Sequence, residues 1–95
     1  MKEINLDASA WRQRDDFYNA LLTALGAPPW HGRNLDALND SIGGDDINAV
    51  RLPFQIRITN TVSTPPELLR YLQQFAELVT DLRTRNSQEI HLTLD

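Results

Sequence analysis

The stretch LPFQIRIT, residues 52–59, carries the clearest structural signal in the sequence. Leucine, phenylalanine and isoleucine alternate there with glutamine, arginine and threonine, so one face of an extended chain is apolar and the other polar. This pattern predicts a β-strand over Leu52–Thr59 with one side against a core. Pro53 falls near its start, where a missing amide donor is tolerated.

Two weaker alternating segments lie near the ends of the chain. Ile4 and Leu6 alternate with polar neighbours, and residues 90–94 do the same with isoleucine and leucine. Both segments predict short strands with one apolar face.

Helical spacing fills the intervals between the predicted strands. Phe17, Leu21 and Leu25 recur every four residues and predict a helix, which Gly26 ends because glycine tolerates the left-handed turn of a helix end. A longer helix of about five turns is predicted after Leu52–Thr59. Its apolar seam consists of Leu68, Leu72, Phe75, Val79 and Leu82.

The ends of the long helix have recognisable capping residues. Thr64 with Glu67 three residues later matches a capping box, in which each side chain bonds a free backbone amide of the first turn. Asn86 is a predicted left-handed stop, since asparagine adopts that conformation more readily than most residues.

A short helix is predicted inside the stretch PPWHGRNLDALNDSIGG, residues 28–44. Asn34 is a suitable cap, Leu38 and Ile42 give the helix an inward face together with Leu35, and Gly43 and Gly44 are predicted to end it. Such a short helix must be held by packing, which leaves its outward face free for function.

The order of elements is strand, helix, short helix, strand, long helix, strand, with connections long enough for parallel crossovers. We therefore predict an α/β fold, a small three-stranded parallel sheet packed with three to four helices. The 95 residues form one domain, 1–95, since single cores occupy roughly 50 to 200 residues. Because the strands alternate, we expect one face of the sheet to be only partly covered.

Charge and composition narrow the possible functions. Thirteen acidic against nine basic residues give a net charge of −4, which repels nucleic-acid phosphates and favours a basic partner. No cysteine is present, and no apolar run is long enough for a signal peptide or a membrane span. We expect a cytoplasmic protein that binds neither nucleic acid directly nor a membrane.

Two aspartates stand one turn apart on the predicted short helix. Asp36 is explained by the helix dipole, but Asp40 repels Asp36 at a cost of roughly 0.2 to 0.5 kcal/mol. Such a local conflict is somewhat enriched at functional sites, although a solvated helix also tolerates it. Function and a plain solvated face are equally compatible with this pair.

Trp30, Glu77 and Asp81 are further candidates for binding. Tryptophan is favoured at binding hot spots, yet Trp30 suits a core edge equally well. Glu77 and Asp81 form a second acidic pair on the long helix. If that helix neighbours the short one, up to six carboxylates converge, with Asp45 and Asp46 among them; otherwise the pair is an ordinary solvated face.

Catalytic and cofactor motifs are not found. His31 has no second histidine nearby and no ligand spacing, so we predict no metal, and the sequence lacks a phosphate-binding glycine loop, a serine elbow and a cysteine nucleophile. We predict no cofactor and no enzymatic activity. The competing enzyme hypothesis, with Asp36 and Asp40 as acid and base or as metal ligands, requires a concave pocket around them, whereas a binding protein requires exposed carboxylates.

The segment WHGRNLDALND, residues 30–40, resembles the barstar family of bacterial ribonuclease inhibitors, which shares its aromatic, aromatic, Gly, x, Asn-Leu-Asp-Ala-Leu, x, Asp pattern. The order of elements and the position of Phe75 support the resemblance. It implies a small parallel sheet with packed helices, and a partner that is a basic, barnase-type ribonuclease. Family members plug the active site of that ribonuclease with the second helix and the loop before it, where carboxylates occupy the sites of RNA phosphates.

The resemblance also implies roles for individual residues. Trp30 takes an aromatic contact, Gly32 a backbone contact and Asn34 a polar contact, while Asp36 and above all Asp40 make the central charge contacts. Glu77 matches the acidic position of the family on the long helix. The full set of predicted contact residues is Trp30, Gly32, Asn34, Asp36, Asn39, Asp40, Gly43, Glu77 and Asp81.

Three positions depart from the family pattern. Asn39 stands where the best-known member has tryptophan, His31 where it has tyrosine, and Arg33 where it has an acid. We expect Arg33 to pair with Asp36 three residues later and to weaken the field toward a basic partner. The region after the short helix also lacks the expected aromatic residue. These departures keep open a divergent interaction module with another basic protein as partner; in either case we expect a monomer when free.

Overall fold

The computed structural model describes all 95 residues of the chain. A short 3-10 turn at Thr61–Ser63 precedes the last helix. The regular elements in chain order are β1 Lys2–Asp7, α1 Arg14–Leu25, α2 Leu35–Gly44, β2 Phe54–Thr59, α3 Pro66–Arg85 and β3 Ile90–Leu94.

The strands form one parallel sheet in the order β1-β2-β3, with the best-patterned strand in the centre. Ile56 of β2 pairs with Ile4 on one side and Leu92 on the other, so apolar residues line up across the sheet. The predicted α/β fold with a three-stranded parallel sheet and packed helices is confirmed.

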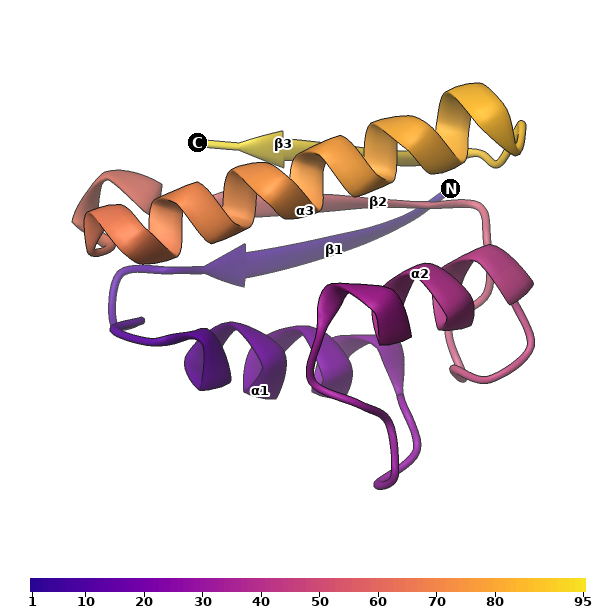
Figure 1. Cartoon of the computed structure of the whole chain (residues 1–95), viewed down its shortest axis with the longest axis horizontal. Coiled ribbons are helices and arrows are strands. Elements are labelled where there is room, and N and C mark those ends of the chain that lie inside the picture. Colours follow the sequence, from indigo (N-terminus) through magenta and orange to yellow (C-terminus); the bar gives the residue numbers. More distant parts are fainter.

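Helices cover the apolar face of the sheet. In Figure 1, α3 runs along the sheet in front of β2, and α1 and α2 follow one another below β1. Phe17 of α1 lies at the centre of the core, where its ring meets those of Trp11, Tyr18, Tyr71 and Phe75 at centroid distances between 4.9 and 6.2 Å. The polar strand residues stay exposed or half-buried on the other face, as the alternation predicted.

The central strand begins two residues later than predicted. Phe54 makes the first pair with Lys2 of β1, whereas the amide of Leu52 donates to Asp45 Oδ1 at 2.8 Å. Because the Leu52 amide is bonded to a loop and Pro53 has no amide donor, neither residue can join the ladder.

Helix α2 ends at its two glycines as predicted, but neither glycine takes the left-handed conformation of the helix end. Gly43 and Gly44 are its last helical residues, and Asp45 takes the left-handed conformation with φ 54°. A short polar side chain can adopt this conformation when it bonds locally, and the Asp45 carboxylate accepts the Leu52 amide.

Both predicted caps of α3 are wrong. The Thr64 hydroxyl donates to the carbonyl of Thr61 at 2.6 Å and closes the 3-10 turn, so Pro65 is the N-cap and no capping box forms with Glu67. At the other end Asn86 has φ −102°, and Ser87 is the left-handed residue. The predicted stop at Gly26 is confirmed, with φ 64°.

Candidate functional site

Helix α2 presents its acids outward because its other side is anchored. Asn34 caps the helix in an extended conformation, and its Oδ1 accepts the Ala37 amide at 2.7 Å, as the sequence predicted. Leu38 and Ile42 are buried against the core. This anchoring fixes the rotation of the helix, so that Asp36, Asn39 and Asp40 are all exposed.

The carboxylates of Asp36 and Asp40 are not compensated within the protein. Neither side chain forms a hydrogen bond or an ion pair in the structure. Like charges one turn apart repel each other, so an uncompensated pair on an exposed helix gains from a positively charged partner.

The expected pairing of Arg33 with Asp36 is wrong. Arg33 instead donates through Nη2 to Asn19 Oδ1 at 2.7 Å, and its Nη1 lies 3.5 Å from Asp15 Oδ1. Arg33 precedes the extended cap residue Asn34 and is outside the helix, so the helical spacing that brings residues three apart together does not apply to it.

Trp30 stands out on the surface beside α2. Its side chain is 73% exposed, although it is one of the two tryptophans of the chain and the other, Trp11, is buried in the core. Of the two roles that the sequence left open for Trp30, a core edge is therefore excluded.

Gly32 allows the Trp30 loop to approach α2 closely. A Cβ added to Gly32 would lie 3.0 Å from the Cβ of Ala37 and 3.4 Å from Asn34 Nδ2. A Cβ at these distances would be tightly packed, so glycine favours the close approach of the loop to the first turn of the helix.

An open hollow of about 140 Å³ brings part of the predicted contact set together. This volume is below the roughly 300 Å³ from which small-molecule sites begin. The hollow suits one inserted side chain better than a substrate, and no enclosed cleft surrounds the two acids. It is lined by Trp30, His31, Gly32, Ala37, Asp40, Ser41 and Ile47. We call the exposed residues of this region the docking surface: Trp30, Gly32, Asn34, Asp36, Asn39 and Asp40.

Gly43 is oriented toward α3 and the loop before β3. A Cβ added to it would lie 3.4 Å from Leu82 Cδ2, and its carbonyl already accepts a hydrogen bond from the side chain of Gln88. Gly43 therefore lies at the contact between α2 and α3.

The acidic pair of α3 lies apart from the hollow. Helix α3 does contact α2, but Glu77 and Asp81 line a separate open depression with Ala76 and Thr80. Asp81 lies 3.9 Å from Arg85, and the Asp45 carboxylate is bonded to the Leu52 amide. Glu77 and Asp81 therefore do not share the hollow with Asp40, although the two acidic helices are neighbours.

A supporting role for three buried side chains beneath the docking surface was not predicted from the sequence. His31, Ser41 and Asn48 are 7%, 2% and 6% exposed and are linked by hydrogen bonds. A signal was available: Ser41 is a polar residue on the inward side of α2, next to Ile42, and a buried hydroxyl needs a partner.

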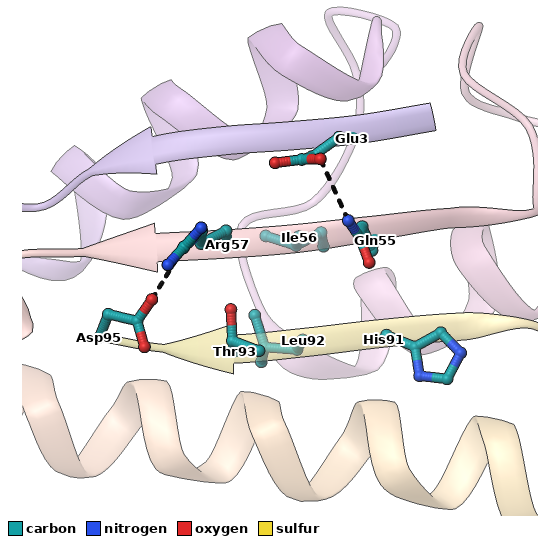
Figure 2. Close-up of a pocket in the computed structure, with 8 residues that line it drawn as sticks. All are labelled: Glu3, Gln55, Ile56, Arg57, His91, Leu92, Thr93 and Asp95. Atoms are coloured by element: carbon teal, nitrogen blue, oxygen red, sulfur yellow. Dashed lines mark hydrogen bonds and ion pairs between the residues drawn. The ribbon is translucent and has the colours of Figure 1, made fainter. Parts of the chain in front are cut away.

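The open face of the sheet has a hollow of its own, shown in Figure 2. Its volume is about 290 Å³, and four of the polar side chains that line it bond in two pairs. Arg57 Nε donates to Asp95 Oδ2 at 2.8 Å, and Gln55 donates to Glu3 at 3.2 Å. The docking surface contributes no residue to this hollow.

No group of three or more histidine, aspartate or glutamate side chains is arranged to hold a metal ion. None of the helices combines the length and the apolar character that crossing a membrane requires.

A small α/β domain with an acidic helix, an exposed tryptophan and a hollow the size of one side chain has the geometry of a protein-binding module. The family model described as Barstar (barnase inhibitor) matches residues 1–95, the whole chain. The chain belongs to the barstar family. No individually curated protein matches it.

Proposed function

We propose that this protein inhibits a basic, barnase-type ribonuclease by covering its active site with the docking surface. The observation that carries the proposal is the uncompensated pair Asp36 and Asp40 beside the exposed Trp30, in a chain of the barstar family. The protein has no chemistry of its own in this role, because occlusion needs only a stable complex.

Electrostatics supports this partner. A ribonuclease binds RNA phosphates with basic residues, and two carboxylates on a fixed helix can occupy the same sites. A net charge of −4 also steers a basic protein toward the chain and raises association rates by about 10- to 1000-fold over an uncharged encounter. Asp40 makes the central contact, since it alone of the two acids lines the hollow beside Trp30.

Rigidity supports high affinity. The Asn34 cap, the buried Leu38 and Ile42, and the close approach at Gly32 hold the helix and the loop in place before binding. A surface that is ordered in advance loses less entropy on association. Trp30 then contributes a large aromatic area with few rotatable bonds.

The outer residues of the predicted set complete the interface. Glu77 and Asp81 lie on the helix that packs against α2, so a partner that covers the docking surface extends over them. Gly43 contributes at the junction of the two helices. A standard contribution of about 800 Å² per partner is a small part of the 5349 Å² of accessible surface.

The proposed mechanism implies the cell compartment and the oligomeric state in which the protein acts. An inhibitor that protects the producing cell acts in the cytoplasm as a monomer, ready to capture any ribonuclease that remains inside. It needs no cofactor.

A second candidate function is an interaction module with another basic protein as partner. Two features favour it: Asn39 replaces the tryptophan of the best-known family member, and Asp45 ends α2 in a region without the expected aromatic residue. Arg33 no longer counts in its favour, because its side chain is bonded to α1 and not to Asp36.

The test is a calorimetric titration of this protein into a barnase-type ribonuclease at low and moderate salt. We expect one-to-one binding that weakens with salt, and a loss of about 100-fold or more for Asp40→Ala, which is the usual range for a charged hot spot. Glu67→Gln is the matched control, since it removes one negative charge from the exposed start of α3. Equal effects of the two substitutions would contradict the assignment of Asp40, and no binding of the unmodified protein would leave the second candidate.

A further inference from the structure

The ring of His31 bridges two elements. Its Nδ1 lies 2.7 Å from the carbonyl oxygen of Gly32, and its Nε2 lies 2.8 Å from the hydroxyl oxygen of Ser41 on α2. A carbonyl oxygen only accepts, so Nδ1 must carry the hydrogen. In the neutral ring Nε2 is then the acceptor, and the Ser41 hydroxyl donates to it.

The hydrogen positions on His31 and Ser41 fix the orientation of the Asn48 side-chain amide. The Ser41 hydroxyl donates its only hydrogen to His31, so the atom of Asn48 that lies 3.1 Å away must be the donor Nδ2. The reverse orientation of the amide would place one hydrogen between two acceptors. The other amide atom of Asn48, Oδ1, is buried and has no hydrogen-bond partner.

The result is one directed chain of hydrogen bonds from the segment after α2, through α2, to the loop that carries Trp30. Its three side chains are buried and lie directly beneath the docking surface, and two of them, His31 and Ser41, line the hollow there. The alternative acceptor of the Ser41 hydroxyl, the carbonyl of Leu38, is 3.4 Å away and is the weaker bond.

We propose that His31 is a positioning residue, whose neutral form with a hydrogen on Nδ1 fastens the Trp30 loop to α2 and thereby fixes Trp30 relative to Asp40. Trp30 itself is exposed and directly precedes His31, whose amide donates to the Pro28 carbonyl at 3.0 Å and closes the turn around Trp30, so the His31 ring ties this turn to α2. The proposal rests on the proposed function only in taking this surface as the binding site. The opposing hypothesis is that the ring merely fills space, which phenylalanine would do equally well.

The first experiment needs no partner. Long-range proton–nitrogen NMR correlations of the histidine ring distinguish its tautomers, and we expect the His31 pattern of hydrogen on Nδ1 at neutral pH. A hydrogen on Nε2, or on both nitrogens, would overturn the proposal. His91 is exposed on β3 and serves as the internal reference.

The second experiment measures the order of the Trp30 indole by the heteronuclear Overhauser effect in His31→Phe and Ser41→Ala. We expect Trp30 to become more mobile in both variants, and the double variant to be no more mobile than the worse single one. The buried indole of Trp11 is the control and stays rigid. If His31→Phe does not fold, Ser41→Ala alone still decides, because it removes only a hydroxyl; unchanged order of Trp30 would refute the proposal.

Binding adds a functional readout. We expect each variant to weaken binding to a barnase-type ribonuclease by about 3- to 10-fold, mainly through faster dissociation, since ordering one side chain costs that much on association. Unweakened binding by both variants would count against positioning. Failure of the unmodified protein to bind would refute the proposed function instead, and the two NMR experiments would still test positioning.

Discussion

Arg33 Nη2 donates to Asn19 Oδ1 at 2.7 Å, so the cation nearest to Asp36 in the sequence is bonded to α1 and not to Asp36. Arg33 stands where the best-known family member has an acid, and this change suggested a weaker site for a basic partner. The fold reduces the effect, because the Arg33 side chain is bonded to α1. The positive charge remains near the surface, but the carboxylate of Asp36 stays free.

Removing the Arg33 charge should speed up binding. We expect Arg33→Ala to raise the association rate with a basic ribonuclease at low salt, and to change the free energy of unfolding by less than about 1 kcal/mol because exposed pairs contribute little. Stopped-flow kinetics at two salt concentrations measure the rate. Arg70→Ala is the control, since it removes the same charge from an exposed arginine of α3 that forms no ion pair; equal acceleration by both would show a net-charge effect only.

The two glycines at helix ends should respond oppositely to alanine. Gly26 has φ 64°, and an added Cβ would lie 2.7 Å from the Cβ of Ala49, so Gly26→Ala should lower the free energy of unfolding by about 1 to 3 kcal/mol. Gly44 is helical and faces only Asp46 Oδ1 at 3.2 Å, an exposed side chain that can move. Gly44→Ala should therefore be neutral or stabilising by up to about 1 kcal/mol. Urea unfolding of both variants tests the pair, and a similar loss in both would contradict this explanation.

The start of α3 offers a test of its capping. Thr64→Val removes the hydroxyl that bonds the Thr61 carbonyl in a buried position, at an expected cost of about 0.5 to 1.5 kcal/mol. Glu67→Ala should stay within about 0.5 kcal/mol, because the exposed Glu67 has only a long 4.0 Å contact with Arg14. Thermal unfolding measures both changes. A substantial loss of stability in Glu67→Ala would show that Glu67 does take part in a capping box.

The buried tyrosine pair should make stability fall at high pH. Burial, followed by the 2.5 Å hydrogen bond to Tyr71, raises the pKa of Tyr18 above its ordinary value of 10.0. The unfolded chain therefore loses this proton at a lower pH than the folded one, so stability is complete below pH 10 and falls as the pH rises beyond it. Denaturant unfolding across this range measures the slope, and Tyr18→Phe should flatten it; a slope that stays the same in the variant would rule out Tyr18 as its source.

Local pattern was sufficient to predict the fold. Alternation in β2, the four-residue spacing in α1 and the apolar seam of α3 each repeat over many residues, and periodic burial against one core leaves few other arrangements. The predicted caps of α3 failed for a different reason. The Thr64 hydroxyl bonds the Thr61 carbonyl three residues back, and Ser87 rather than Asn86 takes the left-handed conformation, so a competing local arrangement replaced each predicted cap.

The sequence by itself determined the sheet, the helices, the acidic face of α2 and the resemblance that marks its predicted contacts, since all of these depend on residues close together in the chain. Only the tertiary structure decided that Trp30 is exposed, that Arg33 bonds α1, that Glu77 and Asp81 lie outside the hollow, and that His31 links the loop to α2. The physical reason is range: periodicity is a property of neighbouring residues, whereas the free or bonded state of a charge depends on groups that folding brings together from distant parts of the chain.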